Sequence, residues 1–176
     1  MSAVIRLSYK VQASPELLFD LARSIDVHKD STRQTGEEAI AGKMTGLIEL
    51  DEEVTWRAKH FGIWQTLSNR ITAYDRPHHF RDSMVRGAFK RFDHDHRFTK
   101  LSDKVTLMED VFSYSAPLGP LGWLAERFFL NTYMTRFLNE RNLVVIELAE
   151  SGRWREYLTS SDSASGRLAP VQDLIR

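Results

Sequence analysis

Residues 121–150 read LGWLAERFFLNTYMTRFLNERNLVVIELAE, and no glycine or proline follows Gly122 in this stretch. An uninterrupted run of this length predicts one helix from about residue 121 to about residue 150. Thirty helical residues extend over about 45 Å, far more than an average helix in a globular protein. We therefore expect the rest of the chain to pack around one long C-terminal helix.

From Leu130 onward this helix is predicted to be amphipathic, because its apolar residues fall in one broad arc and most polar residues lie opposite. Arg141 lies in the middle of the arc, where a buried charge needs a partner. It can form a salt bridge with a sheet carboxylate, snorkel to solvent, or anchor the anionic end of a ligand. The arc comprises Leu130, Tyr133, Met134, Phe137, Leu138, Val144, Val145 and Leu148.

The first turns of the helix add apolar residues on its other side, namely Leu121, Trp123, Leu124, Phe128 and Phe129. Either this end is buried all round, or it carries an exposed patch that seeks a partner. The second interpretation supports a protein-interaction module and a possible homodimer.

A sheet is predicted from segments rich in β-branched and aromatic residues that are separated by short turn signals. Consecutive strands with short breaks favour an antiparallel meander. The predicted strands are 4–11, 47–50, 53–61, 64–74, 80–89, 90–101 and 104–114.

Two short helices are predicted after the first strand, because Ser14 suits an N-cap and Pro15 suits the first helical position. They cover about 15–24 and then continue toward Asp30, and residues 31–45 are expected to be a loop. The fold class is α+β, with an antiparallel sheet of six to seven strands wrapped around the long helix. One domain (1–154) is followed by a polar, Ser-rich tail (155–176) that we expect to be disordered.

The composition is ordinary for a globular protein, with 42% hydrophobic and 27% charged residues. The 24 acidic and 24 basic residues balance, so the chain lacks the basic excess typical of nucleic-acid binding. The first residues show no apolar segment typical of a signal peptide, and we expect no membrane-spanning helix because no apolar run is long enough. With no cysteine, disulfides are excluded, and we expect a cytoplasmic protein without stable membrane insertion.

The segment 92–98, FDHDHRF, alternates so that His94 and His96 share one strand face with Phe92 and Phe98. Two imidazoles at this spacing can bind a metal, with His60 as a third ligand. They can also be hydrogen-bonded polar groups lining a cavity, or they can lie on the surface. With no cysteine and no clear carboxylate ligand, we expect no metal. Because no dinucleotide fingerprint or phosphate loop is present, we also expect no cofactor.

Other polar residues on the predicted strands share faces with apolar ones. Asp82, Met84 and Arg86 lie on the face of Phe80, where Asp82 and Arg86 can form an internal ion pair. Only one of two neighbouring carboxylates, Glu109 and Asp110, can point inward, and periodicity does not decide which. The central-strand residues Trp56 and Trp64 are core residues or line a pocket.

The order of these elements resembles the START, polyketide cyclase/dehydrase and birch-pollen-allergen (SRPBCC) superfamily, in particular its bacterial ligand-binding branch. The resemblance covers about residues 3–152. Its carriers are VQASPE (11–16), AKHFG (58–62), FDHDHRF (92–98), DVFSYSAPLG (110–119) and YMTRFLNERN (133–142). It implies a helix-grip fold with a hydrophobic cavity between the sheet and the long helix. Members hold lipids, sterols or polyketides there, and some catalyse cyclisation or dehydration, but they share no catalytic motif.

The favoured hypothesis is binding of a hydrophobic small molecule of lipid, polyketide or aromatic type, without catalysis. The alternative enzyme is a cyclase or dehydratase with His94 or His96 as general acid or base and Asp82 or Asp110 as orienter. The expected ligand-binding residues come from the face analysis: Trp56, His60, Met84, Arg86, Phe92, His94, His96, Tyr114, Leu130, Met134, Phe137 and Arg141.

Overall fold

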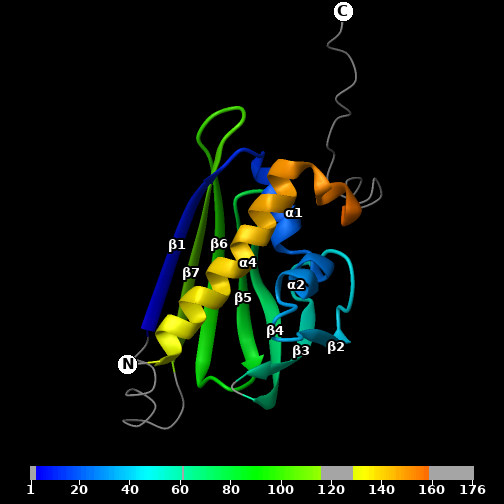
Figure 1. Cartoon of the computed structure of the whole chain (residues 1–176), viewed down its shortest axis with the longest axis vertical. Helices are drawn as coiled ribbons and strands as arrows, with labels where there is room; N and C mark the ends of the chain where they lie inside the picture. Colours follow the sequence, from blue (N-terminus) through cyan, green and yellow to red (C-terminus); the bar gives the residue numbers. More distant parts are fainter. Residues whose placement is uncertain (1–2, 61, 116–128, 159–176) are drawn as a thin grey trace, which may run out of the picture.

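The computed structural model describes residues 3–60, 62–115 and 129–158 (Figure 1). Within these residues one sheet contains seven strands, and every neighbouring pair is antiparallel. In spatial order the strands are β1 (Ala3–Val11), β7 (Thr106–Ser115), β6 (Arg91–Lys100), β5 (His79–Arg86), β4 (Ile63–Asp75), β3 (Glu53–His60) and β2 (Glu38–Gly42).

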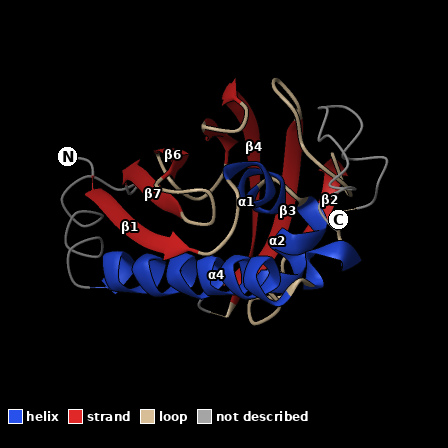
Figure 2. Ribbon diagram, turned by 90° about the horizontal axis from the view of Figure 1, so that it is seen from above, coloured by secondary structure: helices blue, strands red, loops and turns tan. Residues whose placement is uncertain are grey.

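Helices cover one face of this sheet. The long helix α4 (Asn131–Ser151) lies along the inside of the curved sheet in Figure 2. The short helices α1 (Pro15–Ala22) and α2 (Ile25–Ser31) carry the chain from one sheet edge, β1, to the other, β2. This arrangement confirms the predicted α+β fold with a sheet wrapped around a C-terminal helix.

Both short helices begin at a serine cap. The Ser14 hydroxyl accepts a hydrogen bond from the Leu17 N–H at 3.3 Å, and Pro15 occupies the first turn, as predicted. Ser24 caps α2 in the same way, accepting from the Val27 N–H at 3.3 Å. Each cap satisfies a backbone donor that the helix itself leaves free.

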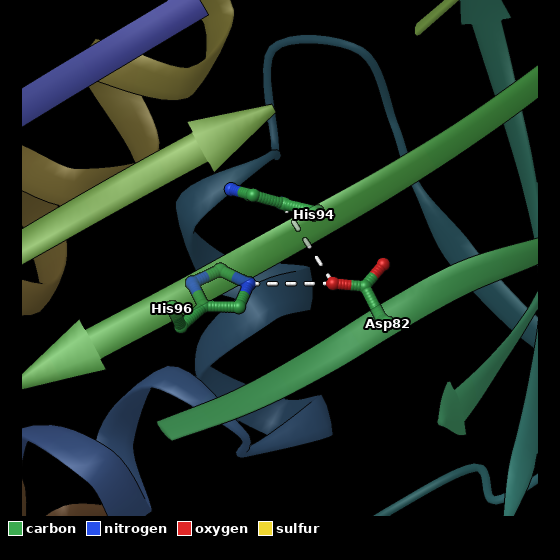
Figure 3. Close-up of side chains that lie close together, drawn as sticks. All are labelled: Asp82, His94 and His96. Atoms are coloured by element: carbon green, nitrogen blue, oxygen red, sulfur yellow. Dashed lines mark hydrogen bonds and ion pairs between the residues drawn. The ribbon is translucent and has the colours of Figure 1, made fainter. Parts of the chain in front are cut away.

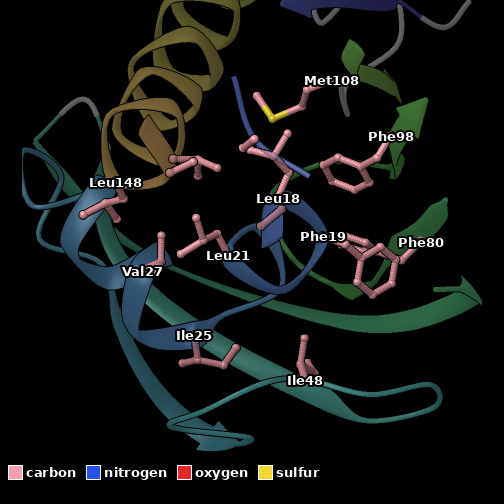
Figure 4. Packing of buried hydrophobic residues seen from close by; sticks show 14 of the residues in the cluster. Leu18, Phe19, Leu21, Ile25, Val27, Ile48, Phe80, Phe98, Met108 and Leu148 are labelled. Atoms are coloured by element: carbon pink, nitrogen blue, oxygen red, sulfur yellow. The ribbon is translucent and has the colours of Figure 1, made fainter. Parts of the chain in front are cut away.

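The core consists of two apolar clusters. The first joins α1 and α2 to the C-terminal half of α4 and to β5–β7, with residues such as Leu18, Phe19, Phe98 and Leu148 (Figure 4). The second joins the N-terminal half of α4 to β1, β6 and β7. Its buried members are Ile5, Phe92, Phe112, Tyr114, Met134 and Leu138.

Two predictions of local structure are wrong. Residues 47–50 form no strand; Leu47 makes only an isolated bridge to Ser24, and Ile48 is buried in the first cluster. The missing strand is β2, inside the predicted loop 31–45. β2 is a mostly exposed edge strand with a register shift between Ala39 and Ala41, so it carries none of the apolar alternation that signals a half-buried strand.

The structure describes the C-terminal end of the predicted long helix but only part of its N-terminal end. Helix α4 begins at Asn131, and the predicted start near residue 121, with Trp123 and Phe128 of the apolar patch, lies outside the described residues. Phe129 is exposed. After α4 the short 3-10 helix η2 (Arg153–Glu156) leads to Tyr157 and Leu158, which pack against the first cluster, and the remaining tail also lies outside the described part. No helix in that part is long and apolar enough to cross a membrane.

Candidate functional site

A cavity of about 110 Å³ lies between the inner face of the sheet and α4. Most of its wall is apolar and comes from β3, β4, β6, β7 and α4. Eight of the residues singled out from the sequence line it: Trp56, Asp82, Phe92, His94, His96, Met134, Phe137 and Arg141.

The polar residues that β5, β6, β7 and α4 direct inward form one layer between the two apolar clusters. On β6 the inward-facing residues run Phe92, His94, His96, Phe98, so the histidines separate a member of the second cluster from a member of the first. The same order recurs on three neighbouring elements. It reads Phe80, Asp82, Met84 on β5; Met108, Asp110, Phe112 on β7; and Leu138, Arg141, Asn142, Val145 on α4.

Asp82 and the two histidines lie within contact distance of one another (Figure 3). Asp82 Oδ1 is 3.3 Å from His96 Nε2 and 3.7 Å from His94 Nδ1. On the other side, Asp110 Oδ1 is 2.7 Å from His96 Nδ1 and 3.6 Å from His94 Nε2. His96 therefore bridges two carboxylates, one from β5 and one from β7.

Two amides hold these carboxylates in place. Asn142 Nδ2 of α4 donates to Asp110 Oδ2 at 2.5 Å, and Asn69 Nδ2 of β4 donates to Asp82 Oδ2 at 2.9 Å. Of the two neighbouring carboxylates that the sequence left undecided, Asp110 points inward and Glu109 lies on the other strand face. The interacting side chains of the layer thus come from five elements, β4, β5, β6, β7 and α4.

The charges in this layer shift one another's pKa values. Burial alone would raise the pKa of Asp110, but the charge of His96, followed by that of His94, holds the pKa well below its usual range. Burial also opposes the lowered pKa of Asp82, which results chiefly from the His96 hydrogen bond. Burial would lower the pKa of His96, but the charge of Asp110 outweighs burial and the pKa is raised. The pKa of His94 is lowered, first by burial and then by the neighbouring charge of His96. The layer therefore favours a charged His96 and a neutral His94.

Arg141 is buried in the same layer, with 6% of its surface exposed. Its Nη2 donates to the Ala22 carbonyl oxygen at the end of α1, at 2.9 Å. Within the described residues no carboxylate comes into salt-bridge distance of Arg141, and its Nε has no hydrogen-bond partner. The predicted salt bridge and the snorkelling geometry are both wrong, and the ligand anchor stays a prediction.

Five of the residues expected to bind ligand do not line this cavity: His60, Met84, Arg86, Tyr114 and Leu130. Arg86 is exposed, so the predicted ion pair with Asp82 is wrong, and Asp82 contacts the histidines instead. Met84 and Leu130 pack against the second cluster, in which Tyr114 is buried. Trp64, whose role the sequence left open, is exposed on the surface.

His60 contacts Tyr133 and Glu37 rather than His94 and His96. Its Nδ1 is 2.7 Å from the Tyr133 hydroxyl, and its Nε2 is 3.7 Å from Glu37 Oε1. Glu37 Oε2 in turn is 2.5 Å from His28 Nε2 on α2. Glu37 and His28 line the inner cavity, Tyr133 lines a second hollow of about 300 Å³, and Phe137 lines both spaces. Phe137 therefore separates the inner cavity from the outer hollow.

Sequence reasoning missed Asn69, Asn142, His28 and Glu37. A signal existed for Asn69, because it alternates with Leu67 and Ile71 on the inner face of β4. Asn142 was placed among the polar residues of α4, although it follows Leu138 by four positions, a spacing that places two residues on one helix face. For Glu37, which lies in a loop, no periodic signal was present.

No protein-family model matches this chain, and no curated protein matches it either. Solved structures do. The Zhui aromatase/cyclase of a Streptomyces species is 13% identical with a TM-score of 0.69, covering 91% of this chain and 98% of that one. Norcoclaurine synthase of Thalictrum flavum, a point mutant bound to a transition state analogue, is 9% identical with a TM-score of 0.62, covering 87% and 97%. Ginseng major latex-like protein 151 from Panax ginseng is 13% identical with a TM-score of 0.58, covering 84% and 97%.

At these identities the likeness establishes the fold. A seven-stranded antiparallel sheet around one long C-terminal helix, with two short helices after β1, is a helix-grip fold. The chain therefore has the fold of the START, polyketide cyclase and birch-pollen-allergen superfamily, as its sequence predicted.

Proposed function

We propose that this protein binds a hydrophobic small molecule with one polar end in the cavity between the sheet and α4. The observation that carries the proposal is the unequal lining of that cavity. Aromatic and aliphatic side chains form most of its wall, and a few polar groups interrupt it, among them Asp82, His94 and Arg141. Small-molecule sites in proteins combine an apolar wall with a few placed polar groups in this way.

The size of the cavity narrows the class of ligand. At about 110 Å³ it is smaller than the roughly 300–1,000 Å³ of pockets for drug-sized ligands. It is closer to an engineered apolar cavity of about 150 Å³ that binds benzene. We therefore favour a ligand with a single aromatic ring or a short acyl chain over a long lipid.

Two buried polar atoms without a hydrogen-bond partner indicate how the ligand would be oriented. His94 Nε2 and Arg141 Nε are buried and lack a hydrogen-bond partner within the described residues. A buried polar atom without a partner costs about 1–3 kcal/mol, and a carboxylate or carbonyl oxygen of a ligand would satisfy these donors. The body of the ligand would then contact Phe92, Phe112 and Met134.

The proposal is tested with protein that has been unfolded, stripped of bound molecules and refolded. Thermal unfolding is recorded with benzoate, benzyl alcohol, a short fatty acid and a long fatty acid, and native mass spectrometry of the untreated protein looks for a co-purified molecule. We expect the small ligands to raise the melting temperature in a concentration-dependent way and the long fatty acid to raise it least. No shift with any ligand and no co-purified mass would contradict the proposal.

Arg141→Met is expected to weaken benzoate binding by about tenfold or more and to change benzyl alcohol binding little. The reason is that a hydrogen bond to a charged group contributes about 1.5–3 kcal/mol, and only benzoate offers the charge. Isothermal titration calorimetry measures both ligands. Arg136→Met is the control, because Arg136 lies on the same helix with its side chain exposed and paired to Glu140. Equal losses for both ligands, or equal effects of both variants, would rule out an anchoring role.

A second candidate function is a cyclase or dehydratase, supported by the pairing of a neutral His94 with a charged His96 that lies between carboxylates. His94 is positioned to remove a proton from a carbon next to a carbonyl group, and Arg141 to stabilise the negative oxygen that results. The Zhui structure is that of an aromatase/cyclase. Under this hypothesis His94→Gln should abolish turnover of a poly-β-ketone substrate while binding persists. Unchanged turnover in His94→Gln would exclude this role for His94.

A further inference from the structure

We propose that Asp82, His94 and His96 form a binding site for one divalent first-row transition-metal ion on the wall of the cavity. Within the described residues this is the group of potential ligands whose donor atoms lie close enough together, all within 4.8 Å of one another. The proposal does not depend on the identity of the small-molecule ligand.

The distances fit a metal centre. Metal–nitrogen and metal–oxygen bonds of about 2.0–2.2 Å at a tetrahedral angle place two ligand atoms about 3.2–3.6 Å apart. Asp82 Oδ1 lies 3.3 Å from His96 Nε2 and 3.7 Å from His94 Nδ1. Both separations are at or near those values, and the third, between the two histidine nitrogens, is within 4.8 Å. Coordination of one ion would require the imidazole rings to adjust until all three separations match.

For two of the three residues, Asp82 and His96, the atoms that would not touch the metal already have the partners that metal ligands have in known sites. A metal-bound histidine usually donates its other ring N–H to a carboxylate, and a ligating carboxylate is itself hydrogen-bonded. Here His96 Nδ1 is 2.7 Å from Asp110 Oδ1, and Asp82 Oδ2 accepts from Asn69 at 2.9 Å. Asn142 in turn holds Asp110 at 2.5 Å. Hydrogen bonds therefore orient Asp82 and His96, whereas His94 Nε2 lies 3.6 Å from Asp110 Oδ1 without a hydrogen bond.

The donor set and the surroundings indicate the class of ion. Two imidazoles and one carboxylate, without thiolates, suit zinc, iron(II), cobalt(II) and similar ions rather than calcium or magnesium. Three protein ligands leave at least one coordination position, as in catalytic rather than structural zinc sites. Because all three residues line the cavity, that position would be open to a small molecule with an oxygen donor.

The sequence could not indicate this site. His94 and His96 were recognised as a possible pair, but the third ligand was sought at His60, which contacts Tyr133 and Glu37 instead. The carboxylate comes from β5, which pairs with β6 so that Asp82 lies directly opposite His94.

The test uses the full-length protein, freed of metal with a chelator, and titrates it with zinc chloride in a calorimeter. We expect one ion per chain and, with cobalt(II) in place of zinc, a visible absorption spectrum typical of fewer than six ligands. His94→Ala and Asp82→Asn should each weaken zinc binding by more than the roughly 10–100-fold loss caused by changes outside the ligand set.

The matched control is His79→Ala. His79 forms another histidine–carboxylate pair between β5 and β6, 2.7 Å from Asp95, and belongs to no group of potential metal ligands within the described residues. The His79→Ala variant should bind zinc as tightly as the unaltered protein does. Thermal unfolding followed by circular dichroism checks that each variant is folded. If His94→Ala does not fold, Asp82→Asn provides the test, because asparagine keeps the shape of the aspartate side chain.

Absence of zinc uptake, or equal uptake by His94→Ala, Asp82→Asn and the unaltered protein, would overturn the proposal and leave the cluster as a hydrogen-bonded network. Small-molecule binding is measured in parallel with EDTA present, so the two proposals fail separately. Because His94 and Asp82 also belong to the proposed ligand site, the two variants are compared by their loss of zinc binding, and the metal-free unaltered protein alone decides whether benzoate binds.

Discussion

His96→Leu is expected to lower the free energy of unfolding by about 3–5 kcal/mol, the cost of removing one partner from a buried charge pair. His96 is 2% exposed and lies between Asp82 and Asp110. Leucine fills most of the space but leaves two carboxylates facing each other across a low-dielectric interior, with no positive charge between them. Chemical denaturation at neutral pH, with urea as denaturant, measures the difference.

His79→Leu provides the comparison for this experiment. The His79 side chain is 28% exposed, and its partner Asp95 keeps two hydrogen bonds from Arg81, at 2.9 and 3.0 Å. Partly exposed ion pairs of this kind contribute about 0–1 kcal/mol, so we expect a loss below about 1 kcal/mol. Losses of similar size in the two variants would show that the polar layer does not depend on His96 as its charge bridge.

Met134→Trp is expected to weaken binding of every ligand by at least about tenfold, equivalent to about 1.4 kcal/mol of binding free energy. Met134 is 8% exposed, lines the cavity and belongs to the second cluster. The indole ring is larger than the methionine side chain and would occupy the space that a ligand needs. If the ring enters the cavity, the melting temperature is retained, whereas overpacking would cost about 1–3 kcal/mol of stability.

Leu143→Trp is the matched control, because Leu143 lies on the same helix and is 50% exposed. Calorimetric titration of both variants with benzyl alcohol measures the binding. Undiminished binding to a folded Met134→Trp protein would show that the ligand binds elsewhere, and the outer hollow beside Tyr133 would then be the next region to examine.

Part of the candidate site was predictable because strand alternation is a local property. FDHDHRF places both histidines on one face whatever the rest of the chain does, and helical spacing places Arg141 in the apolar arc of α4. Neither pattern identifies the residue that the inward-facing side chain contacts. For Arg141 a salt bridge, snorkelling to solvent and a ligand anchor all stayed open, and in the structure it donates to the Ala22 carbonyl, more than a hundred residues earlier in the chain.

The errors in the fold have the same origin. Residues 47–50 are apolar enough to suggest a strand, but Leu47 and Ile48 are buried against the short helices without pairing along their length. The edge strand β2 forms because its backbone pairs with the backbone of β3. Such pairing requires no particular side chains on an exposed edge strand, so the sequence does not predict it.

By itself the sequence determined most of the elements, the long C-terminal helix and the shared strand face of His94 and His96, since these follow from spacing along one segment. The tertiary structure alone decided that Asp82, His94, His96 and Asp110 meet, because their contacts depend on the register between β5, β6 and β7. It also decided which of Glu109 and Asp110 faces α4 and how much space remains beside them. Register and cavity size result from how separate segments pack together, and no single segment of the sequence carries that information.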